Sequence, residues 1–338
     1  MIFGPCPLND ALGAVLAHSV QTNGGKLAKG TLLGVAEIAQ LRAAGHDPVE
    51  VARLEPGDIG EDAAASRIAA ALLPVPDPGL RATLAHTGRV NLIATRPGLL
   101  SFDETAIHAL NLTHPAITLA TLPPLARLAP GTLAATVKII TYAVPQSALV
   151  LAEQAAGRAA IRHLAPVCRT AGLILTGTGA KDDKLAAKGR ATMAARLATL
   201  GVELIDTAVV AHDEAALARA LAMTKGDILL ILTSAATSDL MDTAPSALRR
   251  AGGSVARFGM PVDPGNLLFH GQLGSRPVIG LPGCARSPAL NGADWVLDRL
   301  VCGVPVTDEM VARMGVGGLL KEIPIRPSPR ERGRAGQP

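Results

Sequence analysis

The sequence predicts an α/β protein. Its C-terminal part forms a doubly wound, mostly parallel sheet, and an N-terminal mixed α+β part precedes it. Between residues 166 and 305, short apolar runs alternate with longer segments of helical spacing. This alternation is typical of a parallel sheet with helices on both faces. Before residue 166 the strand-like and helix-like segments are less regular, and Pro-Gly turns separate some of them.

The composition sets the size and the class of the protein. The chain has 338 residues, a length that suits two or three domains, and 49% of its residues are hydrophobic but only 2% aromatic. Its core must therefore be filled by Ala, Leu and Val. We expect an N-terminal helical and strand segment at 1–60, a mixed α+β domain at 61–165, the parallel-sheet domain at 166–305, and an extension at 306–338 with a disordered end.

Charge and cysteine content exclude several functions. The balance of 32 basic against 28 acidic residues, a formal net charge of +4, is too even for a general nucleic-acid surface. The four cysteines form no CxxC pair, which argues against a zinc site. No basic signal peptide begins the chain, and no apolar run approaches the ~18 residues of a membrane helix. We expect a reduced, cytoplasmic protein with no membrane partner.

The first 165 residues predict these elements in order. Residues 8–20 have helical spacing, with Asn9 or Asp10 available as the cap. Next come a turn at Gly30, a helix that ends near Gly45 and a strand over 49–54. The rest predicts a helix over 60–73, strands within 88–103 and 130–145, and a helix over 146–164.

The C-terminal part predicts strands and helices in alternation. We expect strands over 172–177, 202–210, 227–233, 255–262 and 277–283, with helices over 182–201, 213–226, 244–253 and 288–301. Ligands of such sheets bind beyond the carboxyl ends of the strands. We therefore expect the loops at 176–184, 233–242, 263–271 and 280–288 to converge at one edge and carry the chemistry.

The first loop, "LTGTGAKDDK", offers an anion site. Glycines at 177 and 179 let the backbone approach a ligand, and the free amides of a helix that starts near Asp182 attract anions. Lys181, Lys184 and Lys188 add positive charge. The alternative is a plain glycine turn before a capped, solvated helix. Taken alone, this loop favours that alternative.

The second loop, "TSAATSDLMD", is rich in hydroxyls and acids. Thr233, Ser234, Thr237 and Ser238 supply donors and acceptors. Asp239 and Asp242 supply carboxylates, which bind a metal, act as a base or cap the next helix. Both the capping and the ligand-binding interpretations stay open, because four hydroxyls exceed what one cap requires.

The third and fourth loops, "VDPGNLLFHG" and "GLPGCARSPA", each place a Pro-Gly turn directly after a strand. We expect His270 to be a packed or solvent-exposed residue rather than a catalytic one. We expect Cys284 to be an inert small residue, with a thiol activated by a helix N-terminus as the alternative. Arg286 is a candidate phosphate ligand, and a solvated side chain is the alternative.

Taken together, the order "TGTGAKDD", "SAATSDLMD", "DPGN" and "GLPGCA" resembles the MoaB/Mog-type molybdopterin-binding domain family. Residues 1–55 are similar to the segment that precedes this domain in the molybdopterin molybdotransferase branch. Residues 61–165 resemble a segment of molybdopterin-binding proteins linked to cofactor cytidylyl transfer.

The resemblance implies that the second loop holds the pterin and its phosphate. Ser234 and Ala235 stand where the family has Gly-Gly, Asn266 stands where it has Lys, and Cys284 where it has Asn. Asp242 stands at the family's second-loop acid, and Asp182 and Asp183 stand near its first-loop acid. The expected ligand-binding residues are Thr176, Gly177, Thr178, Gly179, Lys184, Thr233, Ser234, Ala235, Thr237, Ser238, Pro264, Gly265, Asn266, Gly280, Pro282, Gly283, Cys284, Arg286 and Ser287.

The resemblance implies a molybdopterin-binding protein that acts in the synthesis, modification or delivery of molybdenum cofactor. Its partners would be molybdoenzymes or cofactor-synthesis proteins, and a homo-oligomer is expected. One alternative is an active transferase for molybdenum insertion or nucleotidyl transfer, in which Asp242, Asp182 and Asp183 are catalytic and Asp242 helps to hold Mg²⁺. Another is an interaction protein that kept the fold and lost the ligand.

Overall fold

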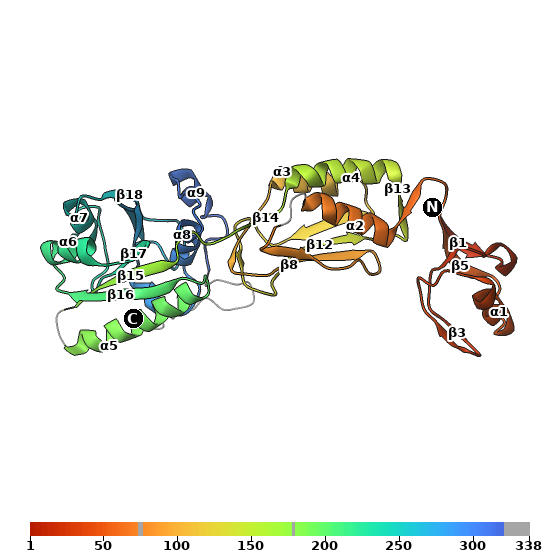
Figure 1. The fold of residues 1–338 in the computed structure, drawn as a ribbon, viewed down its shortest axis with the longest axis horizontal. Coiled ribbons are helices and arrows are strands. Elements are labelled where there is room, and N and C mark those ends of the chain that lie inside the picture. Colours follow the sequence, from red (N-terminus) through yellow and green to blue (C-terminus); the bar gives the residue numbers. More distant parts are fainter. Residues whose placement is uncertain (74–76, 178–179, 321–338) are drawn as a thin grey trace, which may run out of the picture. The chain divides into compact units, whose positions relative to one another are not determined.

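The computed structural model describes residues 1–73, 77–177 and 180–320, without the side chains of residues 180–183. The chain divides into two compact units, and each is described by itself (Figure 1). Unit 1 comprises Met1–Arg96 and Leu100–Leu164, and unit 2 comprises Pro97–Leu99 and Ala165–Pro338. The finer division predicted at residues 60 and 305 stays a prediction.

Unit 1 begins with a small antiparallel sheet of order β1-β5-β2, formed by β1 (Ile2–Cys6), β5 (Val49–Arg53) and β2 (Val15–Leu16). Helix α1 (Val35–Ala43) follows a hairpin of β3 (Val20–Thr22) and β4 (Gly25–Leu27). The buried cluster of this part includes Leu8, Leu16, Leu33 and Leu41.

The helix predicted over residues 8–20 is wrong. A short 3-10 helix η1 (Leu8–Asp10) leads into strands β2 and β3 instead. Gly13 has a left-handed φ of +77°, which turns the chain out of a helical path. Beyond it the amide of Leu16 donates to the Thr31 carbonyl at 2.8 Å. Backbone pairing with distant segments therefore overrides the local helical spacing.

The rest of unit 1 is an antiparallel sheet covered by three helices. The sheet order is β10-β12-β8-β7, with β10 (Ile117–Thr121), β12 (Leu133–Ile139), β8 (Arg89–Ala94) and β7 (Leu80–Ala82). Its apolar cluster joins the sheet to α2 (Glu61–Leu72), α3 (Glu104–Asn111) and α4 (Gln146–Ala159). Two smaller sheets are also present. One pairs β13 (Ala143–Pro145) with β6 (Asp58–Gly60), and the other places β9 (Gly98–Ser101) between β11 (Arg127–Leu128) and β14 (Arg162–Leu164).

The helix predicted over 146–164 ends earlier than expected. Helix α4 stops at Ala159 because Ala160 adopts a left-handed conformation with φ +42°, and the chain then enters β14. Helix α3 and strand β10, which are short, were not predicted.

Unit 2 contains a six-stranded sheet of order β16-β15-β17-β20-β19-β18. Strands β15, β16, β17 and β20 are parallel, whereas β19 runs antiparallel to both of its neighbours. The predicted mostly parallel sheet is therefore confirmed. The strands are β15 (Thr170–Thr176), β16 (Glu203–Val210), β17 (Ile228–Leu232), β18 (Ser254–Phe258), β19 (Phe269–Leu273) and β20 (Arg276–Gly280).

Helices cover both faces of this sheet (Figure 1). Alternate residues of a strand point to opposite faces. Ile174 and Ile231 pack in one apolar cluster with residues of α6 (Glu214–Met223) and α7 (Thr243–Arg250). On the other face α5 (Ala180–Ala198) comes so close that a Cβ added at Gly189 would lie 2.9 Å from Leu232. The remaining helices are η2 (Gly283–Arg286), α8 (Gly292–Val301) and α9 (Asp308–Arg313).

Strand β19 was not predicted, and the strand expected over 255–262 ends at Phe258. The Pro-Gly turn at 264–265 thus does not directly follow a strand; it lies within the connection from β18 to β19. Among the described residues, no helix is long and apolar enough to cross a membrane.

Candidate functional site

The four loops singled out in the sequence meet at one edge of the unit 2 sheet. Strands β15, β17 and β20 are parallel neighbours, so their carboxyl ends share this edge. The register of the last strands aligns Phe258, Phe269 and Gly280. The connection from β18 to β19 therefore starts and ends at the same edge as the loop after β20.

The first and second loops are joined by a hydroxyl network. Thr176, the last residue of β15, is 5% exposed. Its Oγ1 accepts a hydrogen bond from the Ser234 amide at 2.9 Å and lies 3.4 Å from Ser234 Oγ. It also lies 3.0 Å from Nδ1 of His212, which follows β16. Burial of a polar group is tolerated because partners satisfy it, and Thr176 has several.

Within the second loop, small side chains stand at the surface. Ser234 and Ala235 are exposed, whereas Thr233 and Thr237 are buried. The Thr233 hydroxyl donates to the Ala235 carbonyl at 2.6 Å, which folds the loop back on itself. The exposed stretch thus presents one hydroxyl and little bulk at the sheet edge.

Asp242 caps α7. Its carboxylate accepts hydrogen bonds from the amide of Thr243 at 2.7 Å and from the amide of Ser238 at 2.9 Å. The Ser238 hydrogen bond is the main reason that the pKa of Asp242 lies below its usual value, and the Thr243 hydrogen bond contributes. The capping interpretation has direct geometric support, and the metal-binding interpretation stays a prediction.

In the part of the chain that the structure describes, no three His, Cys, Asp or Glu residues are grouped to hold a metal. The side chains of Asp182 and Asp183, and all of Thr178 and Gly179, lie outside the described residues. The expected first-loop anion site therefore remains untested. Lys184 and Lys188 are described, and both are exposed on α5.

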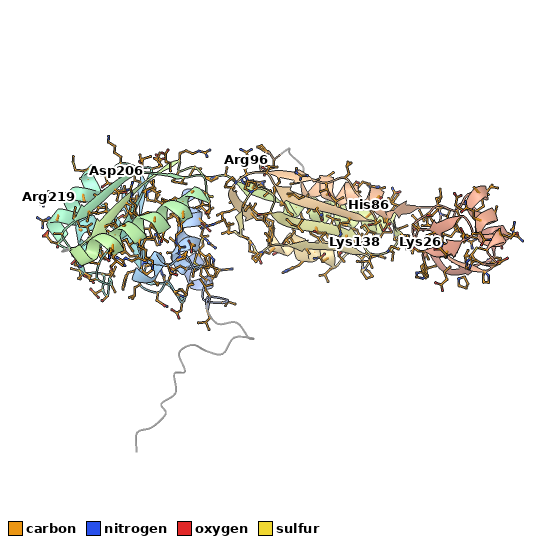
Figure 2. All side chains as sticks on the ribbon, turned by 90° about the horizontal axis from the view of Figure 1, so that it is seen from below. Lys26, His86, Arg96, Lys138, Asp206 and Arg219 are labelled. Carbon is orange, nitrogen blue, oxygen red and sulfur yellow. The ribbon has the colours of Figure 1, made fainter. Side chains whose placement is uncertain are left out.

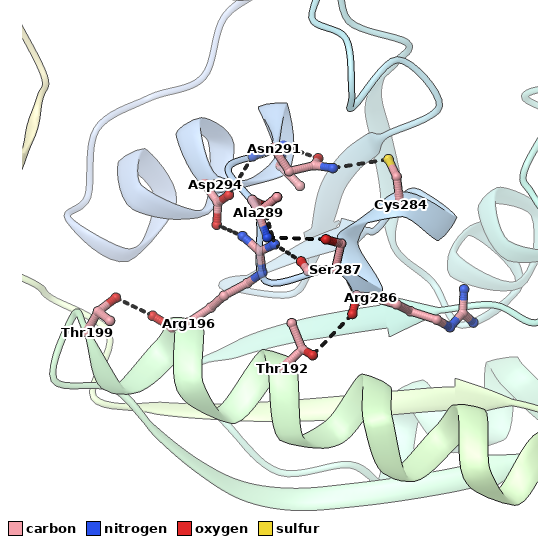
Figure 3. Close-up of polar contacts among 10 residues, drawn as sticks. Thr192, Arg196, Thr199, Cys284, Arg286, Ser287, Ala289, Asn291 and Asp294 are labelled. Atoms are coloured by element: carbon pink, nitrogen blue, oxygen red, sulfur yellow. Dashed lines mark hydrogen bonds and ion pairs between the residues drawn. The ribbon is translucent and has the colours of Figure 1, made fainter. Parts of the chain in front are cut away.

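The fourth loop is tied to the second loop and to α5. The Arg286 guanidinium donates from Nη2 to the Thr233 carbonyl at 2.6 Å. The Thr192 hydroxyl of α5 donates to the Arg286 carbonyl at 3.2 Å (Figure 3). Arg286 thus bridges two of the site loops.

Arg196 of α5 anchors the end of the fourth loop (Figure 3). It forms an ion pair with Asp294 of α8 and donates to the carbonyls of Ser287 and Ala289. Asp294 also accepts the Asn291 amide at 2.9 Å, which caps α8. Both charged side chains are nearly buried, so each charge offsets the cost of burying the other.

The third loop packs against the start of α8. The Gly292 amide donates to the Pro264 carbonyl at 2.8 Å. Gly265 has φ +145°, and a Cβ added there would lie 2.9 Å from the Gly292 backbone. The Asn291 side chain donates to Sγ of Cys284 at 3.1 Å (Figure 3). The third and fourth loops are thereby held together, with Asn266, Gly283, Cys284 and Ser287 exposed.

Gly280 has a packing reason to be glycine. A Cβ there would lie 1.8 Å from the ring of Phe269, which is fully buried. At Gly283 the nearest atom would be Arg286 Nη1 at 3.6 Å, an ordinary contact. Of these two predicted site glycines, the packing therefore requires only Gly280.

Sequence reasoning missed His212. It lies just beyond β16, whose carboxyl end shares the edge with β15. The fifth loop of this edge, "AHDE", follows a predicted strand in the same way as the others, and that was the available signal. His270 is buried in β19, and burial lowers its pKa. It is thus a packed residue, one of the two alternatives expected.

Hollows also flank the edge strand β16. One, of about 340 Å³, is lined by residues that include Asp206 of β16 and Arg219 of α6 (Figure 2). Another, of about 420 Å³, lies between β16 and α5 and includes Arg190 and Ile205. Both are lined by strand and helix residues rather than by the four loops.

Comparison with known proteins assigns a family to this domain. Residues 172–300 match the model of a family described as "Probable molybdopterin binding domain", and residues 5–53 match a domain family of unknown function. No curated protein matches the chain. A solved structure, the molybdopterin biosynthesis MoeA protein from Pyrococcus horikosii, is 15% identical with a TM-score of 0.33, over 89% of this chain and 75% of that one. The chain thus carries, at residues 172–300, a domain of the MoaB/Mog-type molybdopterin-binding family.

Proposed function

We propose that the loop edge of unit 2 binds molybdopterin and that the protein acts in molybdenum cofactor biosynthesis, modification or delivery. The observation that carries this proposal is the meeting of four loops at one sheet edge within the residues that match the family. Ligands of doubly wound sheets bind at the carboxyl ends of the strands.

The exposed residues of this edge suit a polar, phosphorylated ligand. Ser234 and Ala235 are small and exposed, so a planar ring system can approach the second loop. Ser234 and Ser287 offer exposed hydroxyl donors, and Lys184 adds positive charge near the start of α5. Amides and cations at a helix N-terminus favour phosphate. Asn266 lacks the charge that a lysine would bring, so Lys184 carries more of the phosphate interaction.

Titration with molybdopterin and with its dephosphorylated form tests the proposal. We expect Lys184→Ala to weaken binding of the phosphorylated form more than that of the dephosphorylated form. Lys225→Ala is the matched control, because Lys225 is also exposed but lies between α6 and β17, at the opposite edge of the sheet. Absence of binding by the unaltered protein would reject the function. Equal losses for both forms would show that Lys184 does not act through phosphate.

Transferase activity is the second candidate, and one residue favours it. Asp242 lies at the site edge, at the position where the resemblance places the family's second-loop acid, and a carboxylate is a ligand that Mg²⁺ accepts. A turnover assay with molybdopterin, Mg²⁺ and ATP, CTP or molybdate distinguishes it from binding alone. Asp242→Asn should then lose turnover while it keeps the fold. Binding without turnover would assign a binding or delivery role. For that role we propose molybdoenzymes or cofactor-synthesis proteins as partners, and a cytoplasmic location.

A further inference from the structure

We propose that His212 is a positioning residue of the ligand site, which acts through Thr176 to set the main chain and hydroxyl of Ser234. This inference rests on the proposed molybdopterin-binding function. It assigns a role to a residue that neither the motifs nor the four predicted loops contain.

One buried hydroxyl, that of Thr176, contacts both His212 and Ser234. Thr176 Oγ1 lies 2.9 Å from the Ser234 amide nitrogen, 3.0 Å from His212 Nδ1 and 3.4 Å from Ser234 Oγ. A threonine hydroxyl has one hydrogen to donate and two lone pairs to accept. The Ser234 amide has only a hydrogen to offer, so one lone pair of Thr176 is assigned to it.

The hydroxyl hydrogen of Thr176 then has two possible acceptors. His212 Nδ1 is closer than Ser234 Oγ, and a 3.0 Å contact is a better hydrogen bond than one at 3.4 Å. Donation to His212 requires a neutral imidazole with its hydrogen on Nε2. In that arrangement Ser234 Oγ receives no hydrogen from Thr176, so both of its lone pairs stay available to a ligand, and its own hydrogen points to the second lone pair of Thr176.

The same arrangement fixes the backbone. The Ser234 amide is the first main-chain donor after the Thr233 carbonyl, which Arg286 holds. Without an acceptor at His212, the Thr176 hydrogen turns to Ser234 Oγ and occupies a lone pair that the ligand would use. Two carboxylates lie near His212, that of Asp213, the next residue, which caps α6, and that of Asp242, which caps α7. Both carboxylates therefore already have backbone amides as partners.

Three substitutions separate the hydrogen bond from the shape of the side chain. His212→Phe keeps a ring and removes the acceptor. His212→Asn places an amide oxygen where Nδ1 stands. Thr176→Val removes the hydroxyl while it keeps the branched shape. His108→Ala is the control, because His108 is an exposed histidine of α3 in unit 1.

The experiment measures the dissociation constant for molybdopterin by titration, with the unfolding midpoint of each variant measured beside it. We expect His212→Phe to weaken binding about threefold to tenfold, the range of one net hydrogen bond. His212→Asn should bind within about twofold of the unaltered protein. The double variant of His212→Phe and Thr176→Val should lose no more than Thr176→Val alone, because both remove the same bond.

Two results would overturn the inference while the proposed function stands. One is binding by His212→Phe as tight as that of the unaltered protein. The other is equal weakening by Phe and Asn, which would show that ring shape rather than the acceptor matters. If His212→Phe does not fold, binding by His212→Asn and by its double variant with Thr176→Val still tests the hydrogen bond. Failure of the unaltered protein to bind would reject the proposed function itself, and this inference with it.

Discussion

Unit 1 and unit 2 differ in how many polar side chains they bury among the described residues. Among the described residues, Thr22 is the polar side chain buried in unit 1. Unit 2 buries many more, which are Thr176, Thr224, Thr233, Thr237, His270, Asn291, Asp294 and Asp298. Burial of a polar group is costly unless hydrogen bonds compensate it. Most of those in unit 2 lie at the loop edge or at the start of α8. Two of them, Thr176 and Asp294, are compensated by partners far away in the sequence, His212 and Arg196.

This difference indicates which interactions stabilise each unit. The core of unit 1 consists of Ala, Leu, Ile and Val packed between one sheet and its helices. Unit 2 has such cores as well, but its loop edge depends on specific pairs such as Arg196 with Asp294. We therefore expect substitutions of buried polar residues to destabilise unit 2 more than substitutions of polar residues destabilise unit 1. The single tryptophan, Trp295, reports on unit 2, and the single tyrosine, Tyr142, reports on unit 1.

The largest expected effect is that of Asp294→Ala. It leaves the nearly buried Arg196 guanidinium without its carboxylate and removes the Asp294 half of the capping box at the start of α8. Loss of one partner of a buried pair costs about 3–5 kcal/mol. Denaturant unfolding followed by Trp295 fluorescence should show this loss, with the Tyr142 transition unchanged. A loss below about 1 kcal/mol would mean that solvent already compensates the arginine and would weaken the contrast between the units.

Gly280→Ala should have the next largest effect. Its Cβ would overlap the buried Phe269 ring, and overpacking of a core costs about 1–3 kcal/mol. Gly283→Ala is the matched control, because a Cβ there would make only an ordinary 3.6 Å contact and the position lies in the same predicted loop. We expect no change in the Trp295 transition for the control. Equal losses at both positions would contradict the packing explanation for Gly280.

Asp242 should contribute less. Asp242→Ala should cost about 1 kcal/mol as the loss of a helix cap, and Asp242→Asn should cost little, because asparagine caps about as well.

The folded state lowers the pKa of Asp242, so the unfolded chain takes up the proton first as pH falls. This stabilisation is therefore present above the unfolded pKa of about 3.9 and is lost as pH falls through the folded value. Urea unfolding between about pH 5 and pH 2 should show a smaller loss in Asp242→Asn than in the unaltered protein, and parallel curves would contradict this.

The smallest effect is expected in unit 1, from Glu153→Gln. Glu153 accepts two hydrogen bonds of 2.8 Å from Arg67, but both side chains remain accessible to solvent. Exposed pairs contribute about 0–1 kcal/mol and are screened by salt. The Tyr142 transition should shift by less than about 1 kcal/mol. A loss as large as that of Asp294→Ala would remove the contrast between the two units.

The sequence by itself determined the layout of unit 2. Strands such as β17 are continuous apolar runs, and helices such as α6 have their own caps and spacing, so local pattern is sufficient to recognise them. The order of the four loops followed from that alternation. The hydroxyls and the cap at Asp242 were recognisable because capping depends on neighbouring residues.

Only the tertiary structure decided what depends on distant partners. Residues 8–20 have helical spacing, but Val15 and Leu16 form a strand that pairs with β5, because Gly13 turns the chain and the sheet offers backbone partners. Strand β19 is short, and it exists because β18 and β20 lie on either side of it. His212 reaches Thr176 across 36 residues. No local pattern encodes such a bond, because its energy arises only when folding brings the two side chains together.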